Sequence, residues 1–148
     1  MVDKVVDFIN YRKLKMTEIQ LDLTDNHLGV LIVSIADEVA TINKQLATLK
    51  HSKNKMKQNE YNYFYRAKES LINVTKKIEK YFYEAKSLTV TFNELDCIVG
   101  TIESKLQDLI WIERENTPEY QNLCFVHKSL TPVYDKNKAI WEELKADK

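Results

Sequence analysis

The stretch LGVLIVSIADEVATINKQLATL, residues 28–49, decides the fold of this chain. Its main apolar residues alternate spacings of four and three without interruption: Leu28, Ile32, Ile35, Val39, Ile42, Leu46 and Leu49. This spacing places all seven side chains on one side of an α-helix, and over three heptads it is typical of helices that pack lengthwise. We call this row the heptad seam.

Local sequence signals predict where the helix that carries the heptad seam begins and ends. Thr24, Asp25 and Asn26 precede it, and such residues cap helix N-termini well. The seam fails in the polar stretch 51–59, so we expect a turn there. No glycine or proline marks this turn, and one long helix running through it is the alternative.

An aromatic trio repeats in the next segment, as Tyr63-Phe64-Tyr65 and again as Tyr81-Phe82-Tyr83. The repeat distance corresponds to about five full helical turns, so both trios lie on one stripe of a helix over 60–86. We expect Phe64 and Phe82 at the centre of a wide apolar face, with Leu71 and Ile78 beneath them. A face this wide predicts contact with at least two other helices.

The same spacing of three and four predicts helices on either side of this central pair. A first helix is predicted over 2–23. A fourth contains Leu95, Val99, Ile102, Leu106 and Leu109.

Capping residues and prolines predict where the last helices begin and end. Thr91 and Glu94 have the spacing of a capping box for the fourth helix, which we expect to stop near Asn116. Thr117-Pro118 is typical of the start of a fifth helix. Pro132 is expected to restart or kink that helix.

Two short stretches alternate apolar with polar residues, as β-strands do: 19–24 and 88–92. They could pair as a small ribbon at one end of the bundle. Helical ends or extended linkers are the preferred interpretation, because isolated two-stranded ribbons are marginally stable.

Composition agrees with a helical fold. The chain has 148 residues with only two glycines and two prolines, too few for a protein with many tight turns. We predict an all-α fold, an elongated bundle of four to five long amphipathic helices with antiparallel hairpin packing and coiled-coil-like seams. Residues 1–148 are expected to form a single domain.

Cellular location is predicted from the cysteines and the N-terminus. Two isolated cysteines, Cys97 and Cys124, do not make a disulfide framework, and no secretory signal begins the sequence. The longest apolar run, 28–36, is about half of what a membrane crossing needs. We therefore expect a soluble cytoplasmic protein without membrane contact.

No residue pattern predicts a reaction, so we expect no catalytic, cofactor-binding or metal site and no enzyme activity. Cys124 and His127 lie one helical turn apart and could ligate zinc with Cys97, but a structural site needs a fourth donor. A buried thiol beside an interfacial histidine is the preferred interpretation of this pair.

Charge is unevenly distributed although the net charge is zero. Residues 44–86 contain eleven lysines and arginines against four glutamates, whereas the chain from Thr91 onward has eleven acids against seven bases. Attraction between the two halves during packing is the preferred explanation. The alternative is a basic contact surface, with Lys50, Lys53, Lys55 and Lys57 as its centre.

The function that these patterns favour is a non-enzymatic protein-protein interaction module, acting as an adaptor, inhibitor or assembly factor. Its contact surface is predicted on the heptad seam, at Ile35, Val39, Ile42, Leu46 and Leu49, and we expect a homodimer. The alternative is a nucleic-acid-associated protein that uses the basic hairpin 44–86, with weak and non-specific binding.

Overall fold

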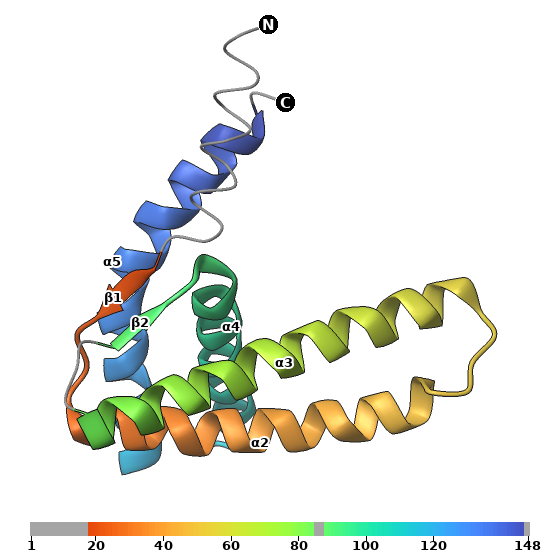
Figure 1. The fold of residues 1–148 in the computed structure, drawn as a ribbon. Helices are drawn as coiled ribbons and strands as arrows, with labels where there is room; N and C mark the ends of the chain where they lie inside the picture. The colour runs from red at the N-terminus through yellow and green to blue at the C-terminus, as the bar shows by residue number, and fades with distance from the viewer. Residues whose placement is uncertain (1–17, 85–87, 147–148) are drawn as a thin grey trace, which may run out of the picture.

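The computed structural model describes residues 18–84 and 88–146 (Figure 1). In this part of the chain lie four helices and two short strands: β1 (Ile19–Leu21), α2 (Asp25–Leu49), α3 (Lys55–Glu84), β2 (Leu88–Val90), α4 (Phe92–Trp111) and α5 (Pro118–Ala146). The chain is mostly helical and the four helices pack against one another, which confirms the all-α class.

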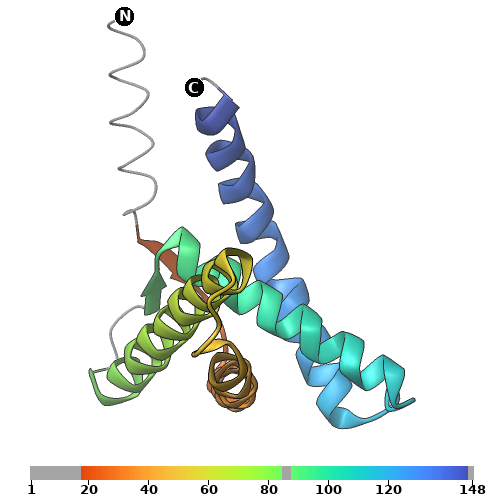
Figure 2. The ribbon, with the colours of Figure 1, turned by 90° about the vertical axis from the view of Figure 1, so that its right-hand side faces the viewer.

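The helices form two antiparallel hairpins, α2 with α3 and α4 with α5, which project in different directions (Figures 1 and 2). α3 packs against α2, α4 and β2, so the predicted contact with at least two other helices is confirmed. α2 also contacts both helices of the other hairpin. The two hairpins therefore share one core where they cross.

This core consists of aliphatic side chains from all four helices. Its fully buried members include Leu31, Ile35, Leu71, Val74, Ile78, Ile98, Ile102, Leu123, Val126 and Leu130. On α2 the heptad seam supplies Leu28, Ile35, Ile42 and Leu46 to this core, and Ile32 and Val39 are partly buried against it, while Leu49 is partly buried at the end of the helix. The seam thus packs within the chain.

The bounds predicted for the seam helix are confirmed. α2 begins directly after Thr24, whose hydroxyl accepts the backbone N–H of His27 at 3.2 Å. It ends at Leu49, and a turn at 50–54 leads into α3. The alternative of one continuous helix is wrong.

α3 differs from its prediction at both its start and its buried face. It begins at Lys55, five residues early, because the Asn54 side chain accepts the N–H of Met56 at 2.8 Å and caps the new helix. Phe82 is not central, because it is 46% exposed. Tyr81, three residues after the buried Ile78, takes the inward position and turns Phe82 toward solvent.

The ribbon alternative is correct, and the predicted helix does not extend over 19–21. β1 pairs antiparallel with β2, and Ile19 lies opposite Val90. The alternation buries one side of each strand against the core, which a helix over the same residues would not achieve. The remainder of the first predicted helix, over 2–17, lies outside the described residues.

The capping box of α4 is confirmed. The Thr91 hydroxyl accepts the Glu94 N–H at 3.2 Å, and the Glu94 carboxylate accepts the Thr91 N–H at 2.8 Å. The same buried carboxylate pairs with Lys77 of α3 at 2.6 Å. One side chain therefore caps α4 and ties it to α3.

The last two helix boundaries depart from prediction. α4 ends at Trp111, not near Asn116, because Glu113 has a left-handed backbone (φ 57°) and the Arg114 N–H bonds back to the Leu109 carbonyl. α5 begins at Pro118, as predicted, but it continues through Pro132 without restarting. Burial of Leu130 before the proline and packing of Val133 and Tyr134 after it hold the helix despite the missing N–H.

The corrected face of α3 predicts unequal effects of two substitutions. Ile78→Ala should lower the free energy of unfolding by about 2–5 kcal/mol, because Ile78 is fully buried. Phe82→Ala should lower it by about 1 kcal/mol or less, because Phe82 is half exposed. Urea unfolding followed by circular dichroism measures both, and equal losses would contradict this assignment of the buried face.

Candidate functional site

The candidate site lies at the end of the α2/α3 hairpin that is farthest from α5, which we call the hairpin tip and define as residues 45–64 (Figure 1). Its turn is held by short polar contacts. The Ser52 N–H donates to the Leu49 carbonyl at 3.2 Å, and the Ser52 hydroxyl accepts the Asn54 N–H at 3.2 Å. These bonds close the turn in place of a glycine.

Packing between the two helices weakens toward this tip. Leu46 is the last buried residue of α2, and Leu71 is the first buried residue of α3. None of the residues from 47 to 70 is buried. The outer part of the hairpin is therefore held by partly exposed side chains, and it leaves space between the helices.

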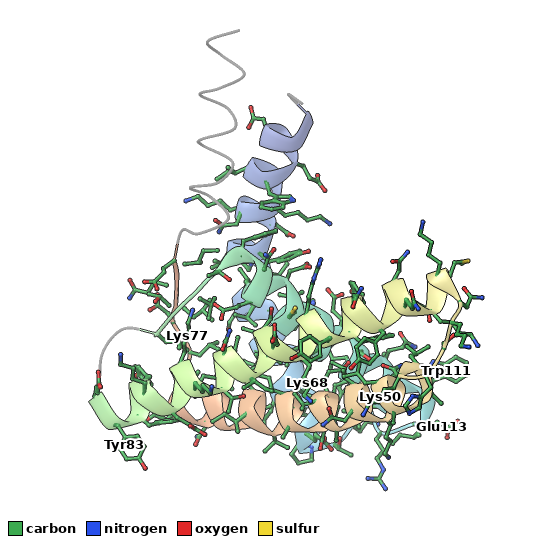
Figure 3. The ribbon with its side chains drawn as sticks, turned by 45° about the vertical axis from the view of Figure 1, so that its right-hand side comes forward. Lys50, Lys68, Lys77, Tyr83, Trp111 and Glu113 are labelled. Carbon is green, nitrogen blue, oxygen red and sulfur yellow. The ribbon has the colours of Figure 1, made fainter. Side chains whose placement is uncertain are left out.

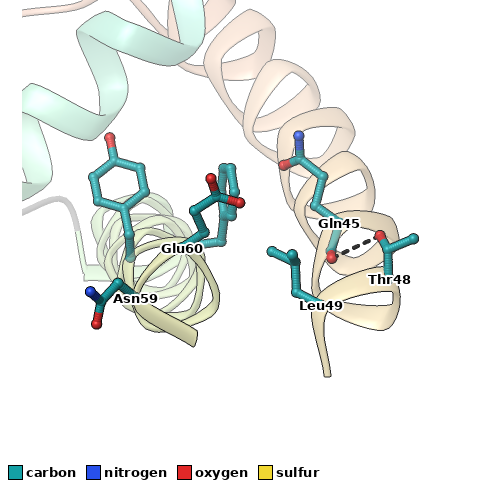
Figure 4. A pocket seen from close by; sticks show the side chains of 7 residues that line it. Gln45, Thr48, Leu49, Asn59 and Glu60 are labelled. Atoms are coloured by element: carbon teal, nitrogen blue, oxygen red, sulfur yellow. Dashed lines mark hydrogen bonds between the residues drawn. The ribbon is translucent and has the colours of Figure 1, made fainter. Parts of the chain in front are cut away.

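That space is a groove of about 560 Å³ (Figure 4). Seven residues line it: Gln45, Thr48, Leu49, Asn59, Glu60, Tyr63 and Phe64. Leu49, Tyr63 and Phe64 supply apolar and aromatic surface, and the Phe64 ring meets Tyr63 edge-on at 5.6 Å between centroids. Gln45, Asn59 and Glu60 add polar groups to its lining, an arrangement typical of binding pockets.

The predicted basic residues lie beside this groove. Lys50, Lys53, Lys55 and Lys57 are all exposed, and none forms an ion pair with another residue in the described part of the chain. The predicted attraction between the two charged halves does not explain these four lysines. The described ion pair between the halves joins Lys77 to Glu94 and leaves the lysines of the tip without a partner among the described residues. The hairpin tip is a concentrated positive surface.

The predicted helical interface is only partly accessible. Ile35, Ile42 and Leu46 are buried within the chain, and Val39 is partly buried against the same core. Leu49 alone borders the groove. Tyr63 and Phe64, which the sequence placed on the wide apolar face of α3, also line the groove, although neither belongs to the predicted helical interface.

A smaller groove of about 380 Å³ lies between α2 and α5. Gly29, Val30 and Val33 line one side, and Glu119, Asn122 and Leu123 line the other. Near it, the His27 ring stacks on the exposed Phe125 at 4.5 Å between centroids. It carries no cluster of like charges, unlike the hairpin tip.

The three residues considered for zinc have separate partners. The Cys97 side chain contacts Ser70, and burial together with the Asp96 carboxylate raises the pKa of its thiol. Cys124 contacts the Tyr120 hydroxyl, and His127 lies 3.1 Å from the Glu103 carboxylate. Among the described residues, no group of three or more His, Cys, Asp and Glu side chains could hold a metal ion.

One carboxyl group has a raised pKa where α2 crosses α4. Burial of Glu38 raises its pKa, the nearby Asp108 carboxylate adds to this, and Lys105 partly opposes it. Lys105 is already engaged, because its ammonium lies 2.5 Å from the Asp37 carboxylate. Glu38 therefore carries its charge at a cost to the fold.

Comparison of the chain with known protein families, with curated protein sequences and with solved structures finds no match. Within the described residues, no helix combines the length and the apolar character that a membrane crossing requires.

The raised pKa of Glu38 predicts that replacing its carboxyl group with a neutral amide stabilises the fold at neutral pH. Because folding raises its pKa, Glu38 favours the folded state most below its ordinary value of 4.5, and this contribution falls as pH rises through the folded pKa. Glu38→Gln should therefore raise the melting temperature at pH 7, and the gain should vanish in acid below the ordinary value. Thermal melts at both pH values test this.

The matched control is Glu69→Gln, which removes the same charge from an exposed position of α3. It should change the melting temperature little at either pH. A Glu38→Gln protein that melts below the unaltered protein at pH 7 would contradict the assignment.

Proposed function

We propose that the chain is a non-enzymatic protein-binding module that binds its partner at the hairpin tip, acting as an adaptor, inhibitor or assembly factor. The observation that carries this proposal is the groove of about 560 Å³ with apolar and aromatic walls beside four exposed lysines. An apolar groove with a few polar groups in its lining suits insertion of one side chain from a partner.

Exposed large side chains on the outer part of α3 support the proposal. Met56 is 74% exposed, Tyr63 is 70% exposed, and Tyr65 is also open to solvent. Tyrosine and methionine are enriched at protein interfaces, and clustered exposed apolar residues mark interaction sites more often than isolated ones. A partner that covers the groove would cover these side chains as well.

The charge of the hairpin tip supports an acidic partner. Unpaired lysines around an apolar groove attract acidic residues before contact and orient them, while the groove supplies the apolar anchor. The partner surface is therefore an apolar or aromatic side chain flanked by carboxylates. Lysine-rich surfaces also bind phosphates, which is the basis of the alternative function below.

Two finer predictions belong to this proposal. We place the protein in the cytoplasm because its cysteines are few and isolated. We retain self-association, but its contact surface moves from the heptad seam to exposed residues, because Ile35, Ile42 and Leu46 are buried within the chain. Coiled-coil pairing between copies through these three residues would first require the core to open.

Photo-crosslinking tests the site. Benzoylphenylalanine in place of Tyr63, which lines the groove, should crosslink to a protein partner in cells that express the chain, because that side chain would lie within the contact. The same substitution at Tyr83 is the control, since Tyr83 is 91% exposed at the other end of α3 (Figure 3). Crosslinking that is equal at both positions, or absent at position 63, would contradict the proposal.

A nucleic-acid-associated protein is the second candidate, favoured by the exposed and unpaired lysines of the described hairpin tip. We expect at most weak binding, because two tyrosines and a short turn do not make a base-stacking platform or a major-groove module. Labelled single- and double-stranded oligonucleotides titrated at near-physiological salt measure it. Sub-micromolar binding would replace the protein-binding proposal if it is lost in the quadruple variant with glutamate at Lys50, Lys53, Lys55 and Lys57.

The control for this titration carries four glutamate substitutions at exposed lysines away from the tip: Lys76, Lys80, Lys128 and Lys136. It changes the net charge equally. If both quadruple variants lose binding alike, the attraction is a property of total charge and the hairpin tip is not a nucleic-acid site.

A further inference from the structure

A second unusual surface lies at the turn between α4 and α5, which we call the Trp111 turn and define as residues 108–119. Three successive large apolar residues are exposed here: Ile110, Trp111 and Ile112. Trp111, the last residue of α4, is 78% exposed (Figure 3). Leu109 beside them is buried, so the exposed residues stand on a helix end that is anchored in the core.

The Trp111 turn is held by hydrogen bonds. The Arg114 N–H donates to the Leu109 carbonyl at 2.8 Å, the Ile112 N–H donates to the Asp108 carbonyl at 3.2 Å, and the left-handed backbone of Glu113 reverses the chain. On the far side the Thr117 hydroxyl donates to the Arg114 carbonyl at 2.8 Å. The exposed indole is therefore presented on a defined turn, which lowers the entropy cost of binding.

The Trp111 turn is acidic where the hairpin tip is basic. It carries one basic residue, Arg114, against four exposed acids: Asp108, Glu113, Glu115 and Glu119. None of these five residues forms an ion pair with another described residue. The described part of the chain thus has two surfaces of opposite charge without ion pairs to other described residues, one beside a groove with apolar walls and the other around a projecting tryptophan.

We infer that the hairpin tip binds the Trp111 turn of a second copy of this chain, an inference that rests on the proposed function. The indole enters the groove beside Leu49, Tyr63 and Phe64, and the acidic residues around it meet the lysines of the tip. Tryptophan is one of the residues enriched among interface anchors. The groove volume of about 560 Å³ falls within the range of roughly 300–1,000 Å³ common for binding pockets.

The contact forms between copies and not within one. The hairpin tip and the Trp111 turn lie on different arms that point in different directions (Figures 1 and 2). Each copy then offers one groove and one tryptophan to different neighbours, so the interface is head-to-tail and the assembly grows past two unless it closes into a ring. This distinguishes it from a twofold dimer through the heptad seam, which stops at two.

Two one-sided variants test the inference. Trp111→Ala removes the inserted side chain, and Tyr63→Glu places a second acid in the groove, which Glu60 also lines. Both positions are exposed, so the fold should persist, as circular dichroism can check. In sedimentation experiments the unaltered chain should grow in mass with concentration, and less so at high salt. Each variant alone should be monomeric, whereas an equimolar mixture should form a 1:1 complex that grows no further, because one groove and one tryptophan remain intact.

Tyr83→Glu is the control, since it adds the same charge at an exposed position outside the groove and should assemble like the unaltered chain. An unaltered chain that stays monomeric, a Trp111→Ala protein that assembles normally, or a mixture that forms no complex would overturn the inference. If one of these outcomes overturns self-association, crosslinking from position 63 to a different protein would still support the proposed function. Absence of both self-association and crosslinking would overturn the two together.

Discussion

Aliphatic packing between the first half of α2 and the second half of α3 is the interaction on which the rest of the structure depends. Leu31 and Ile35 on one helix and Val74 and Ile78 on the other are almost completely buried. Both helices of the other hairpin pack against α2, and β2 packs against α3. Because the core lies at this end of the hairpin, the opposite end projects beyond it and remains open along its length.

Much of the secondary structure could be predicted from short-range signals. The bounds of α2 follow from the heptad spacing and from Thr24, and the start of α4 follows from the capping box of Thr91 and Glu94. These signals involve residues within one or two helical turns of each other. They need no knowledge of the tertiary structure, which explains why the structure bears them out.

Two of the failures, at Phe82 and at the ribbon, arise from contacts that are distant in sequence, whereas the early start of α3 and the early end of α4 arise from local hydrogen bonds. The helical spacing of apolar residues allows either Tyr81 or Phe82 to lie on the buried face of α3. The position of the core relative to the end of this helix decides which of the two side chains turns inward. The ribbon of β1 and β2 is marginal by itself, and it forms because both strands bury a side against the helices. The groove at the hairpin tip arises from an absence of buried side chains, and helical periodicity cannot reveal such an absence.

The ribbon also has a consequence for how the chain reaches this structure. The Thr89 hydroxyl donates to the Glu18 carboxylate across the two strands, at a sequence separation of 71 residues. Closing so long a loop costs configurational entropy before three-residue strands return any favourable energy. A folded α2/α3 hairpin shortens the effective loop, because antiparallel helices bring the residues before α2 close to those after α3. The ribbon should therefore assemble after the hairpin, as a late step in folding. Its stability depends on packing against the helices that have already formed.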